Sequence, residues 1–581
     1  MLCFLRKELR RDDSGRPQTR WDGVTKKLHP ITGEEIPDPA AQVELYTYVN
    51  PRPAPWPEAE FIVGNPPFIG GKDLRAELGD GYAEACWKAR PRLPGGADFV
   101  MHFWDEEATR LLHPGKKGAP NPLIRFGFIT TNSITQTFSR RVIEAHMAAK
   151  EPLSLVYAIP DHPWLKAADK AAVRIAMTVA VRGAMDGVLA EVVSEEGLNT
   201  DTPKVELRLR TGKVRADLTI GADLRSTLEL QCSSLMAHKG VQLNGLGYIL
   251  TQAEAARFQQ DPQYSSRIRP FLNGRDLVQK PRGLYVVDTD GLNLDVLISQ
   301  YPEFYQLLLN RVKPERDENP RASRRNNWWI FGENAPIMRD AVDGLARFIA
   351  TCRTAAHRTF IFQPSSALCE SKVVVIASES PRLLATLSSL VHIAFSDGQG
   401  GWQGVGNDPV YQHTDTFNPF PFPAFSDLPP ALIARLDALG ERLDAFRKAR
   451  LAEHGFLTMT GLYNVLERLR ELEDGADVPP LSDKERDIHE AGLVSVLKEI
   501  HDDIDRAVFE AYGWSDLAPA LVGKPGATTP SPHKRPEQEA AEEELLTRLV
   551  ALNRERAVEE ARGLVRWLRP DYQIPDRKSV V

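Results

Sequence analysis

The chain has 581 residues, of which 42% are hydrophobic and 26% charged, so about three or four domains are expected, and its net charge of −7 does not by itself indicate a nucleic-acid binder. Its five cysteines form neither a C-x-x-C pair nor a close Cys/His cluster, so we expect no disulfide framework and no metal site. No apolar run approaches the roughly 18 residues of a membrane helix, and residues 1–5 are too short for a signal peptide, so we expect a cytoplasmic protein without a membrane partner.

A polar, proline-rich extension over residues 1–57 precedes a region, 58–200, in which predicted strands and helices alternate. Strands are predicted at 60–64, 125–130, 153–159 and 173–181. Helices are predicted at 73–90, 98–112 and 136–150. Alternation of this kind is typical of an α/β fold.

The second half of the chain changes from a mixed pattern over 201–425 to a helical one over 426–581. In the mixed region we predict strands at 205–210, 284–288 and 372–377, and helices at 253–259, 295–310 and 336–347. It ends in alternating Pro and Phe residues at 417–423, which are typical of an extended hinge. The helical region has amphipathic stretches at 431–454, 462–473, 483–512 and 537–568.

The most informative motif is Asn65-Pro66-Pro67-Phe68, which directly follows the predicted strand 60–64. In open α/β sheets, ligands bind at the carboxyl ends of strands. A rigid turn there presents an amide, a backbone carbonyl held by two prolines, and an aromatic ring. These groups suit a flat base carrying an exocyclic amine, although a proline-rich turn without a ligand is the alternative.

The chemistry of adenine N6 asks for these groups, because the lone pair of this amine is delocalised into the ring. Two acceptors on its hydrogens, the side-chain oxygen of Asn65 and the carbonyl of Pro66, favour a more tetrahedral nitrogen that can accept a methyl group. Phe68 can stack on a base taken out of the duplex. The tetrapeptide alone does not fix the acceptor, since related motifs serve RNA, protein and cytosine amines.

Further segments resemble the MmeI-like DNA adenine-N6 methyltransferases, a Type IIG-related family of fused restriction–modification enzymes and their stand-alone relatives. The segments are 62–72, 78–82, 96–100, 127–134, 161–164, 269–276, 404–409, 418–423, 511–514 and 549–553. The resemblance implies a partial Rossmann-like class I methyltransferase sheet over 58–200, a mixed α+β target-recognition domain over 201–425 and a helical domain over 426–581. It also implies S-adenosyl-L-methionine as cofactor and double-stranded DNA as partner.

The sequence lacks the glycine-rich cofactor turn, Asp/Phe-x-x-x-Gly-x-Gly, that this resemblance requires before the Asn65 motif. The one downstream candidate, 395–401 after the strand-like stretch 390–394, is disfavoured because residues 405–423 are too rich in Pro and Gly to form the helix that must follow. Of the cofactor pocket we predict only Asn65. No nuclease carboxylate cluster is found either. We expect a separate polypeptide to carry the cofactor-binding half, or the chain to be a truncated product.

Basic residues gather between Arg311 and Arg325 and are followed by two tryptophans. Lys and Arg neutralise phosphates, and Arg can also read base edges. Interleaved acidic residues leave a solvated helix face as the alternative, and the family resemblance favours DNA. We predict DNA contacts from Lys72, Arg275, Arg311, Lys313, Arg316, Arg321, Arg324, Arg325, Arg353 and Arg358.

Other residues are weaker candidates. Segment 161–164 follows a strand, so it either lines the base pocket or packs as a Pro-Trp loop on the core. Asn132 and Ser133, at the end of another strand, could face the DNA backbone, whereas His102 and His113 are expected to be structural.

The sequence therefore predicts a site-specific DNA adenine-N6 methyltransferase of a restriction–modification or phage-defence system, with catalytic residues Asn65, Pro66, Pro67 and Phe68. The alternative is a non-catalytic DNA-recognition subunit, or a remnant that needs a partner to supply the cofactor motif. An RNA or protein methyltransferase fits the tetrapeptide but not the long downstream regions.

Overall fold

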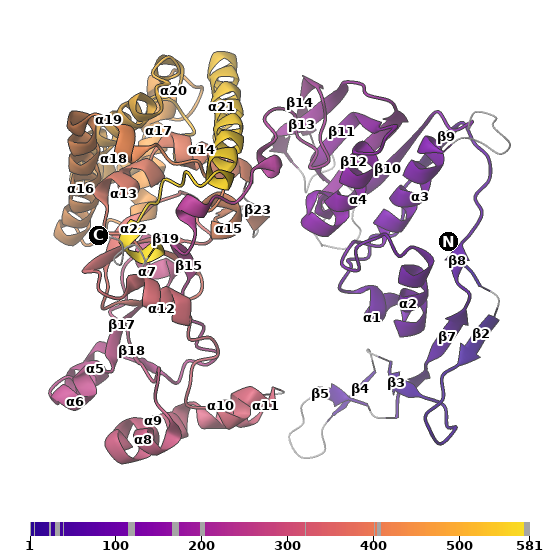
Figure 1. Cartoon of the computed structure of the whole chain (residues 1–581), viewed down its shortest axis with the longest axis horizontal. Helices are drawn as coiled ribbons and strands as arrows, with labels where there is room; N and C mark the ends of the chain where they lie inside the picture. Colours follow the sequence, from indigo (N-terminus) through magenta and orange to yellow (C-terminus); the bar gives the residue numbers. More distant parts are fainter. Residues whose placement is uncertain are drawn as a thin grey trace. The chain divides into compact units, whose positions relative to one another are not determined.

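The structure is a computed structural model that describes residues 2–4, 6–22, 25–28, 35–38, 40–113, 122–164, 174–197, 204–319, 321–399, 401–403 and 408–574. The chain forms two compact units, Met1–Gly221 and Ala222–Val581 (Figure 1). Each unit has its own hydrophobic core and is described by itself. In the part of the chain that the structure describes, no helix is both long and apolar enough to cross a membrane.

Unit 1 begins with short antiparallel strand pairs. These are β1 (Leu2–Cys3) with β8 (Arg52–Pro53), β2 (Arg6–Leu9) with β7 (Tyr46–Val49), β3 (Thr19–Trp21) with β6 (Gln42–Glu44), and β4 (Lys26–Leu28) with β5 (Glu35–Pro37). Helices α1 (Leu74–Leu78) and α2 (Asp80–Ala89) pack beside this ribbon. Gly81 allows the close approach, because a Cβ at this position would lie 1.9 Å from the Tyr46 carbonyl oxygen.

A six-stranded mixed sheet forms the centre of unit 1, in the order β14-β13-β11-β12-β10-β9. Its strands are β9 (Phe61–Gly64), β10 (Arg125–Thr131), β11 (Leu153–Pro163), β12 (Arg174–Arg182), β13 (Gly187–Glu196) and β14 (Lys204–Gly212). β9 pairs in parallel with β10, and β11 in parallel with β13, whereas β12 runs antiparallel to both β10 and β11. β9 lies at one end of the sheet and so is an edge strand.

One face of this sheet packs against helices α3 (Val100–Leu112) and α4 (Thr137–Met147), which lie in front of the strands in Figure 1. Along α3, the buried side chains recur every three or four residues, at Val100, Trp104, Ala108 and Leu111. Trp104 meets Phe126 of β10 edge to face, with 5.2 Å between the ring centroids. Its indole N–H donates to the hydroxyl of Thr178 on β12 at 3.3 Å, which fixes α3 across two strands.

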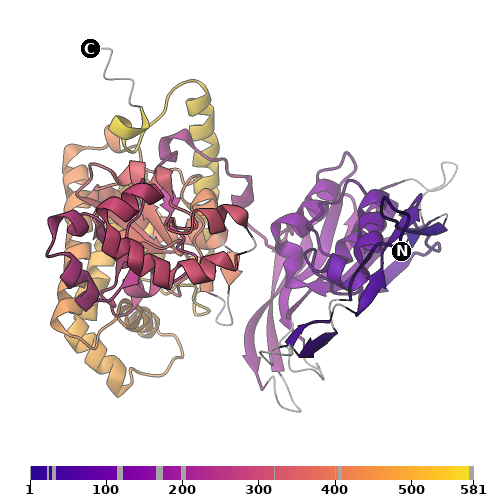
Figure 2. The same ribbon diagram turned by 90° about the horizontal axis from the view of Figure 1, so that it is seen from below.

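Unit 2 contains two four-stranded sheets. One has the order β15 (Ala237–Lys239), β22 (Val373–Ile376), β19 (Arg347–Cys352) and β20 (Ile361–Pro364). The other has the order β16 (Ile249–Leu250), β18 (Tyr285–Val287), β17 (Ile268–Leu272) and β21 (Leu368–Cys369). The strands of the two sheets alternate along the chain. The segments that connect them include α5 (Gln252–Phe258), α8 (Leu294–Gln300), α9 (Pro302–Arg311), α10 (Lys313–Asp317), α11 (Ala322–Asn326) and α12 (Pro336–Val342). The helices of residues 294–326 lie on the near side of unit 2 in Figure 2.

The remainder of unit 2 is helical. Its principal helices are α13 (Pro381–Leu387), α14 (Leu390–Gln399), α16 (Pro430–Glu453), α17 (Met459–Glu473), α18 (Asp483–Gly492), α19 (Val494–Tyr512) and α21 (Pro536–Ala561). One hydrophobic core joins these helices to the strands, so the mixed and helical regions share buried side chains such as Val375, Leu436 and Leu549. Within α17, Arg470 is fully buried and donates to Glu467 at 2.8 Å and to Asp502 of α19 at 3.3 Å.

The structure confirms that unit 1 mixes strands and helices, and it corrects three details. The predicted helix 73–90 is broken at Gly79, whose φ of 79° lies in the left-handed region. Strand β13 was not predicted, and β14 belongs to this sheet because it pairs with β13. The stretch 390–394, predicted as strand-like, begins helix α14, whose side chains are buried on most sides. Of the segment 404–409, residues 404–407 lie outside the described residues.

Candidate functional site

The Asn65-Pro66-Pro67-Phe68 corner lies where β9 ends at Gly64. Because β9 is parallel to β10, and β10 and β11 both run antiparallel to β12, the carboxyl ends of β9, β10 and β11 share one edge of the sheet. Asn65 is exposed, Pro66 is buried, Pro67 is exposed and Phe68 is 38% exposed. No other described residue forms a hydrogen bond with the Asn65 side chain, so its amide is free to bind a ligand.

Asp98 holds the loop that follows this corner. One carboxylate oxygen accepts the backbone N–H of Gly71 at 3.0 Å, and the other accepts the hydroxyl of Ser133, which follows β10. The N–H of Phe99 donates to the carbonyl of Ile69 at 2.9 Å. The two bonds to the Asp98 carboxylate are charge-assisted, and such bonds are among the stronger hydrogen bonds in proteins. The loops after β9 and β10 are thus fixed to each other through one carboxylate.

Gly71 contributes to the same arrangement by its lack of a side chain. A Cβ at Gly71 would lie 2.3 Å from the carbonyl oxygen of Gly96, so no larger residue fits without a backbone shift. Sequence reasoning included Asp98 only within a resembling segment and gave it no role. Asp98 is the first residue of the predicted helix 98–112, but nothing in the sequence shows that its carboxylate binds two loops.

A second polar group lies at the same edge, around Asp161 near the end of β11. The Asn132 side chain donates to Asp161 at 3.4 Å, and the Arg174 guanidinium donates to both Asp161 oxygens at 2.6 Å. Arg174 also donates to Glu195 at 2.6 Å, and chiefly this bond raises the Arg174 pKa. The structure therefore brings together Asn132 and Asp161, which were predicted separately. Arg174 neutralises the Asp161 carboxylate.

Two ionisable groups of α3 lie in the covered core instead of at this edge. His102 is buried, which lowers its pKa to about 4 and keeps the ring neutral. Glu107 is also buried, and its pKa is raised to about 7 despite an ion pair with Arg110 at 3.2 Å. Both groups are enclosed by α3 and its neighbours. Among the described residues, no cluster of three or more His, Cys, Asp or Glu could hold a metal ion.

The predicted DNA-contacting residues fall on both units. Lys72 is exposed in the loop after the corner of unit 1, and Arg275 is exposed in α7 (Gly274–Val278) of unit 2. Five of the predicted basic residues lie in α9–α11 or beside these helices and are exposed or half-buried: Arg311, Lys313, Arg321, Arg324 and Arg325. Some are paired within the protein: Arg311 with Glu254 at 2.5 Å and Lys313 with Asp317 at 2.6 Å. Arg353 is exposed and donates to Gln412 at 3.0 Å.

Two of the predicted DNA contacts are corrected by the structure. Arg316 is buried and donates to the Leu243 carbonyl at 2.8 Å and to the Tyr248 hydroxyl at 3.2 Å. Arg358 is buried and donates to the carbonyls of Cys352 and Pro409. Burial lowers the pKa of Arg358. Both guanidinium groups satisfy backbone acceptors inside unit 2, so neither faces a phosphate.

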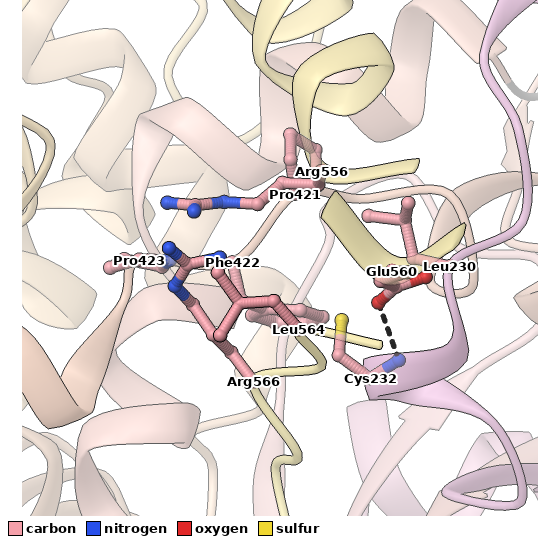
Figure 3. A pocket seen from close by; sticks show the side chains of 9 residues that line it. All are labelled: Leu230, Cys232, Pro421, Phe422, Pro423, Arg556, Glu560, Leu564 and Arg566. Carbon is pink, nitrogen blue, oxygen red and sulfur yellow. Dashed lines mark hydrogen bonds between the residues drawn. The ribbon is translucent and has the colours of Figure 1, made fainter. Parts of the chain in front are cut away.

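Unit 2 has a small pocket, shown in Figure 3, which is lined by Leu230, Cys232, Pro421, Phe422, Pro423, Arg556, Glu560, Leu564 and Arg566. The Glu560 carboxylate accepts the backbone N–H groups of Gln231 at 2.6 Å and of Cys232 at 2.9 Å. Burial raises the pKa of the Cys232 thiol to about 12. The carboxylate is occupied and the thiol is un-ionised, so this pocket joins α21 to residues 231–233 and offers no reactive group.

Comparison with known proteins adds to this picture. Residues 21–189 match the family of the MmeI DNA-methyltransferase domain. The structure is similar to that of the Type IIL restriction-modification enzyme MmeI in complex with DNA, with a TM-score of 0.58 and 17% identity. That match covers 86% of this chain and 57% of the other, so this chain spans little more than half the length of the matched protein. No curated protein matches the chain.

Two further solved structures match more weakly. The type IIG restriction endonuclease BpuSI matches with a TM-score of 0.27 and 13% identity, over 78% of this chain and 54% of that one. The DrdV–DNA complex matches with a TM-score of 0.32 and 12% identity, over 67% of this chain and 44% of that one.

Proposed function

The chain is MmeI-like, and from this premise we propose that it is a DNA methyltransferase of a restriction–modification system that methylates adenine at N6 in duplex DNA. The observation that carries the proposal is the exposed, unpartnered Asn65 amide at the carboxyl end of β9, within the matched methyltransferase segment. The partial Rossmann-like class I sheet belongs to the same proposal. It is supported by the strand order β11-β12-β10-β9 with β12 antiparallel to its neighbours.

In this proposal Asn65 and Pro66 bind the amine. The Asn65 side-chain oxygen and the Pro66 carbonyl accept the two N6 hydrogens, which shifts electron density from the ring back to the nitrogen. Pro67 has no N–H, so no donor competes for these acceptors. Asp98 acts as a positioning residue because it fixes the loop after Phe68 to the loop after β10.

Phe68 is the proposed stacking platform for an adenine taken out of the duplex. Enzymes that modify a base extrude it, because the reacting atom is not accessible inside the stack. The ring of Phe68 is exposed enough to receive a base face. Of the predicted DNA contacts, Lys72, Arg275, Arg311, Lys313, Arg321, Arg324, Arg325 and Arg353 remain proposed phosphate or base contacts, since each is exposed or half-buried.

The methyl donor proposed from the family is S-adenosyl-L-methionine, which supplies an activated methyl group when bound. Among the described residues, Asn65 and Pro66 fit the amine, but no glycine-rich turn between a strand and a helix fits the methyl donor. Residues 395–399, from the one glycine-rich candidate, lie inside helix α14 and not in a turn between a strand and a helix. Of the pocket residues, only Asn65 is assigned here.

The test separates methyl transfer from DNA binding. The full chain, purified from its source cell with its native partners, is given genomic DNA from a strain that lacks the gene and a radiolabelled methyl donor. Asn65→Ala should lose at least about 100-fold in transfer, because an acceptor that polarises the reacting amine contributes several kcal/mol to the transition state. DNA affinity should change less than about threefold, since most affinity comes from phosphate contacts. Asn310→Ala, an exposed asparagine of α9, is the matched control and should retain transfer.

Retained transfer in Asn65→Ala would remove the proposed role of this residue. Loss of DNA binding together with transfer would favour the alternative, a recognition subunit in which the corner only supports the fold.

A further inference from the structure

Leu246 of unit 2 is a large apolar side chain that the fold leaves almost entirely in solvent. It is 79% exposed, and among the described residues of unit 2 the next most exposed large hydrophobic side chain is Ile337, at 56%. In the part of unit 2 that the structure describes, Leu246 joins no hydrophobic core cluster. A single exposed leucine is common on protein surfaces and by itself indicates nothing. The loop that carries Leu246 gives this one a more specific meaning.

The loop of residues 243–248 is held at both ends inside unit 2. At one end, the Leu243 carbonyl accepts from the Arg316 guanidinium at 2.8 Å. At the other end, Tyr248 is fully buried, and its hydroxyl lies 2.8 Å from the Ile330 carbonyl oxygen and accepts from Arg316 at 3.2 Å. One buried guanidinium therefore anchors the loop on both sides.

Between these anchors the backbone of the loop is closely confined. Asn244 has a φ of 51° and Gly245 a φ of 135°, both in the left-handed half of backbone space that few residues adopt. A Cβ at Gly247 would lie 2.5 Å from the carbonyl oxygen of Arg311 in α9, so only glycine fits there without a backbone shift. Leu246 stands between these two glycines. The loop thus presents one apolar side chain rigidly, as a binding residue requires.

Helices α9–α11, in or beside which most of the proposed DNA contacts lie, border this loop. A Cβ at Gly245 would lie 2.9 Å from a carboxylate oxygen of Glu315 in α10. With its amide oxygen turned toward α11, Asn244 accepts from the Arg324 guanidinium at 2.9 Å. Residues 311–325 contain six basic and three acidic side chains, so the segment keeps a positive charge despite Glu315. These helices lie on the near side of unit 2 in Figure 2.

A rigid apolar side chain bordered by cations matches the chemistry of duplex DNA. The phosphates on the outside of the duplex attract Lys and Arg, and the space between two base pairs accepts an apolar side chain such as leucine. A second copy of this chain would instead bring the same positive segment against itself, and like charges oppose such a contact. The charge and the exposed leucine together therefore favour DNA as the occupant.

We infer that Leu246 is a wedge that enters between two adjacent base pairs of duplex DNA while α9–α11 bind the flanking phosphates. This inference rests on the proposed function, which assigns duplex DNA as the partner. Insertion unstacks one base step and kinks the duplex, and the phosphate contacts offset the cost. Arg316 is a positioning residue, because it holds the wedge loop from both ends.

The test measures the kink directly. The full chain is purified from its source cell with its native partners, and the duplex that it binds most tightly is selected from a pool of random sequences. The two ends of this duplex are labelled for fluorescence energy transfer. Side-chain wedges kink DNA by about 20–90°, so binding of the wild-type chain should bring the two ends closer together.

Leu246→Ala should reduce the kink by at least about half, because no side chain remains to separate the base pairs. Leu246→Met, which keeps a long apolar side chain, should retain it. Leu228→Ala is the matched control, at a 55% exposed leucine bonded to Asn553 of α21, which lies far from α9–α11 in Figure 1. The melting temperature of each variant should change by less than about 2 °C, because both leucines are exposed.

The salt dependence of binding separates the wedge from the phosphate contacts. Leu246→Ala removes no phosphate contact, so it should leave the slope of log affinity against log salt unchanged. Arg321→Ala, at an exposed arginine beside α11, should lower that slope by about 0.9 and leave the kink in place.

Absence of a kink in the wild-type complex, or a kink that Leu246→Ala retains, would overturn the inference. If Leu246→Ala dissociates a dimer of this chain and retains the kink, the leucine contacts a second copy and the inference fails. These outcomes are independent of the proposed catalytic role, because Asn65→Ala should keep the kink whether or not it abolishes methyl transfer.

Discussion

The two faces of the unit 1 sheet are built from the same strands, yet their environments differ. On one face Phe126, Phe128 and Ala180 lie buried beneath α3 and α4. On the other face burial is uneven: Ile175 and Val181 are buried, Met177 and Val179 are half-buried, and Val63 is open to solvent. The strand sequences are thus suited to burial on both sides, while among the described helices α3 and α4 cover one face.

The largest effect should come from the covered face. Phe126→Ala should destabilise unit 1 by about 3–5 kcal/mol, because it leaves a cavity between β10 and Trp104. Val63→Ala, at an exposed position on the other face of the neighbouring strand β9, should change the stability of the chain by no more than about 0.5 kcal/mol. Chemical denaturation of the two variants measures the comparison directly. Equal losses would show that the Val63 side chain is buried in the folded chain.

A smaller effect is expected at the edge of the sheet where the loops after β9 and β10 are bonded to Asp98. Asp98→Asn keeps the shape of the side chain but removes its charge, which weakens the bonds from Gly71 and Ser133. The local cost should be about 1–3 kcal/mol. Proteolysis of residues 65–73 should become faster, and methyl transfer should fall while DNA binding is retained. Unchanged protection and unchanged transfer would remove the positioning role of Asp98.

The smallest effect is on the pH dependence of stability. It comes from Glu107 of α3, the helix that packs on the covered face of the sheet. Burial raises the pKa of Glu107 from 4.5 to about 7, so the folded state binds a proton more tightly than the unfolded state. The contribution of this group is therefore fully present below pH 4.5 and is lost as the pH rises toward 7. Glu107→Gln should remove this dependence and make unit 1 relatively more stable at pH 8. Parallel stability curves for wild type and variant would contradict the assignment.

Much of unit 1 could be predicted from local patterns. The strand before Asn65 and the helices near 100–112 and 137–147 follow from apolar spacing and from the Pro-Pro stop. The direction of β12 could not be predicted in this way. The predicted strands 153–159 and 173–181 leave residues 160–172 between them, which is enough for a parallel crossover of about a dozen residues. In the structure β11 extends to Pro163, so only residues 164–173 remain and the connection is too short for a parallel neighbour.

Other features depended on tertiary contacts and could not be predicted. The run from Leu390 is apolar on every side, and such a run does not distinguish a buried strand from a buried helix. Arg316 and Arg358 look like their exposed neighbours in sequence, but folding places backbone carbonyls around them. The role of Asp98 depends on two loops that are distant in sequence.

The central claim is that the corner at Asn65 binds the amine that becomes methylated. The most direct measurement is nucleoside mass spectrometry of genomic DNA from a strain that lacks the gene and is complemented with wild type or with Asn65→Ala. We predict that the wild-type gene restores N6-methyladenine and that the variant does not, at equal protein levels. Restoration by Asn65→Ala, or restoration of methylcytosine alone, would contradict the claim.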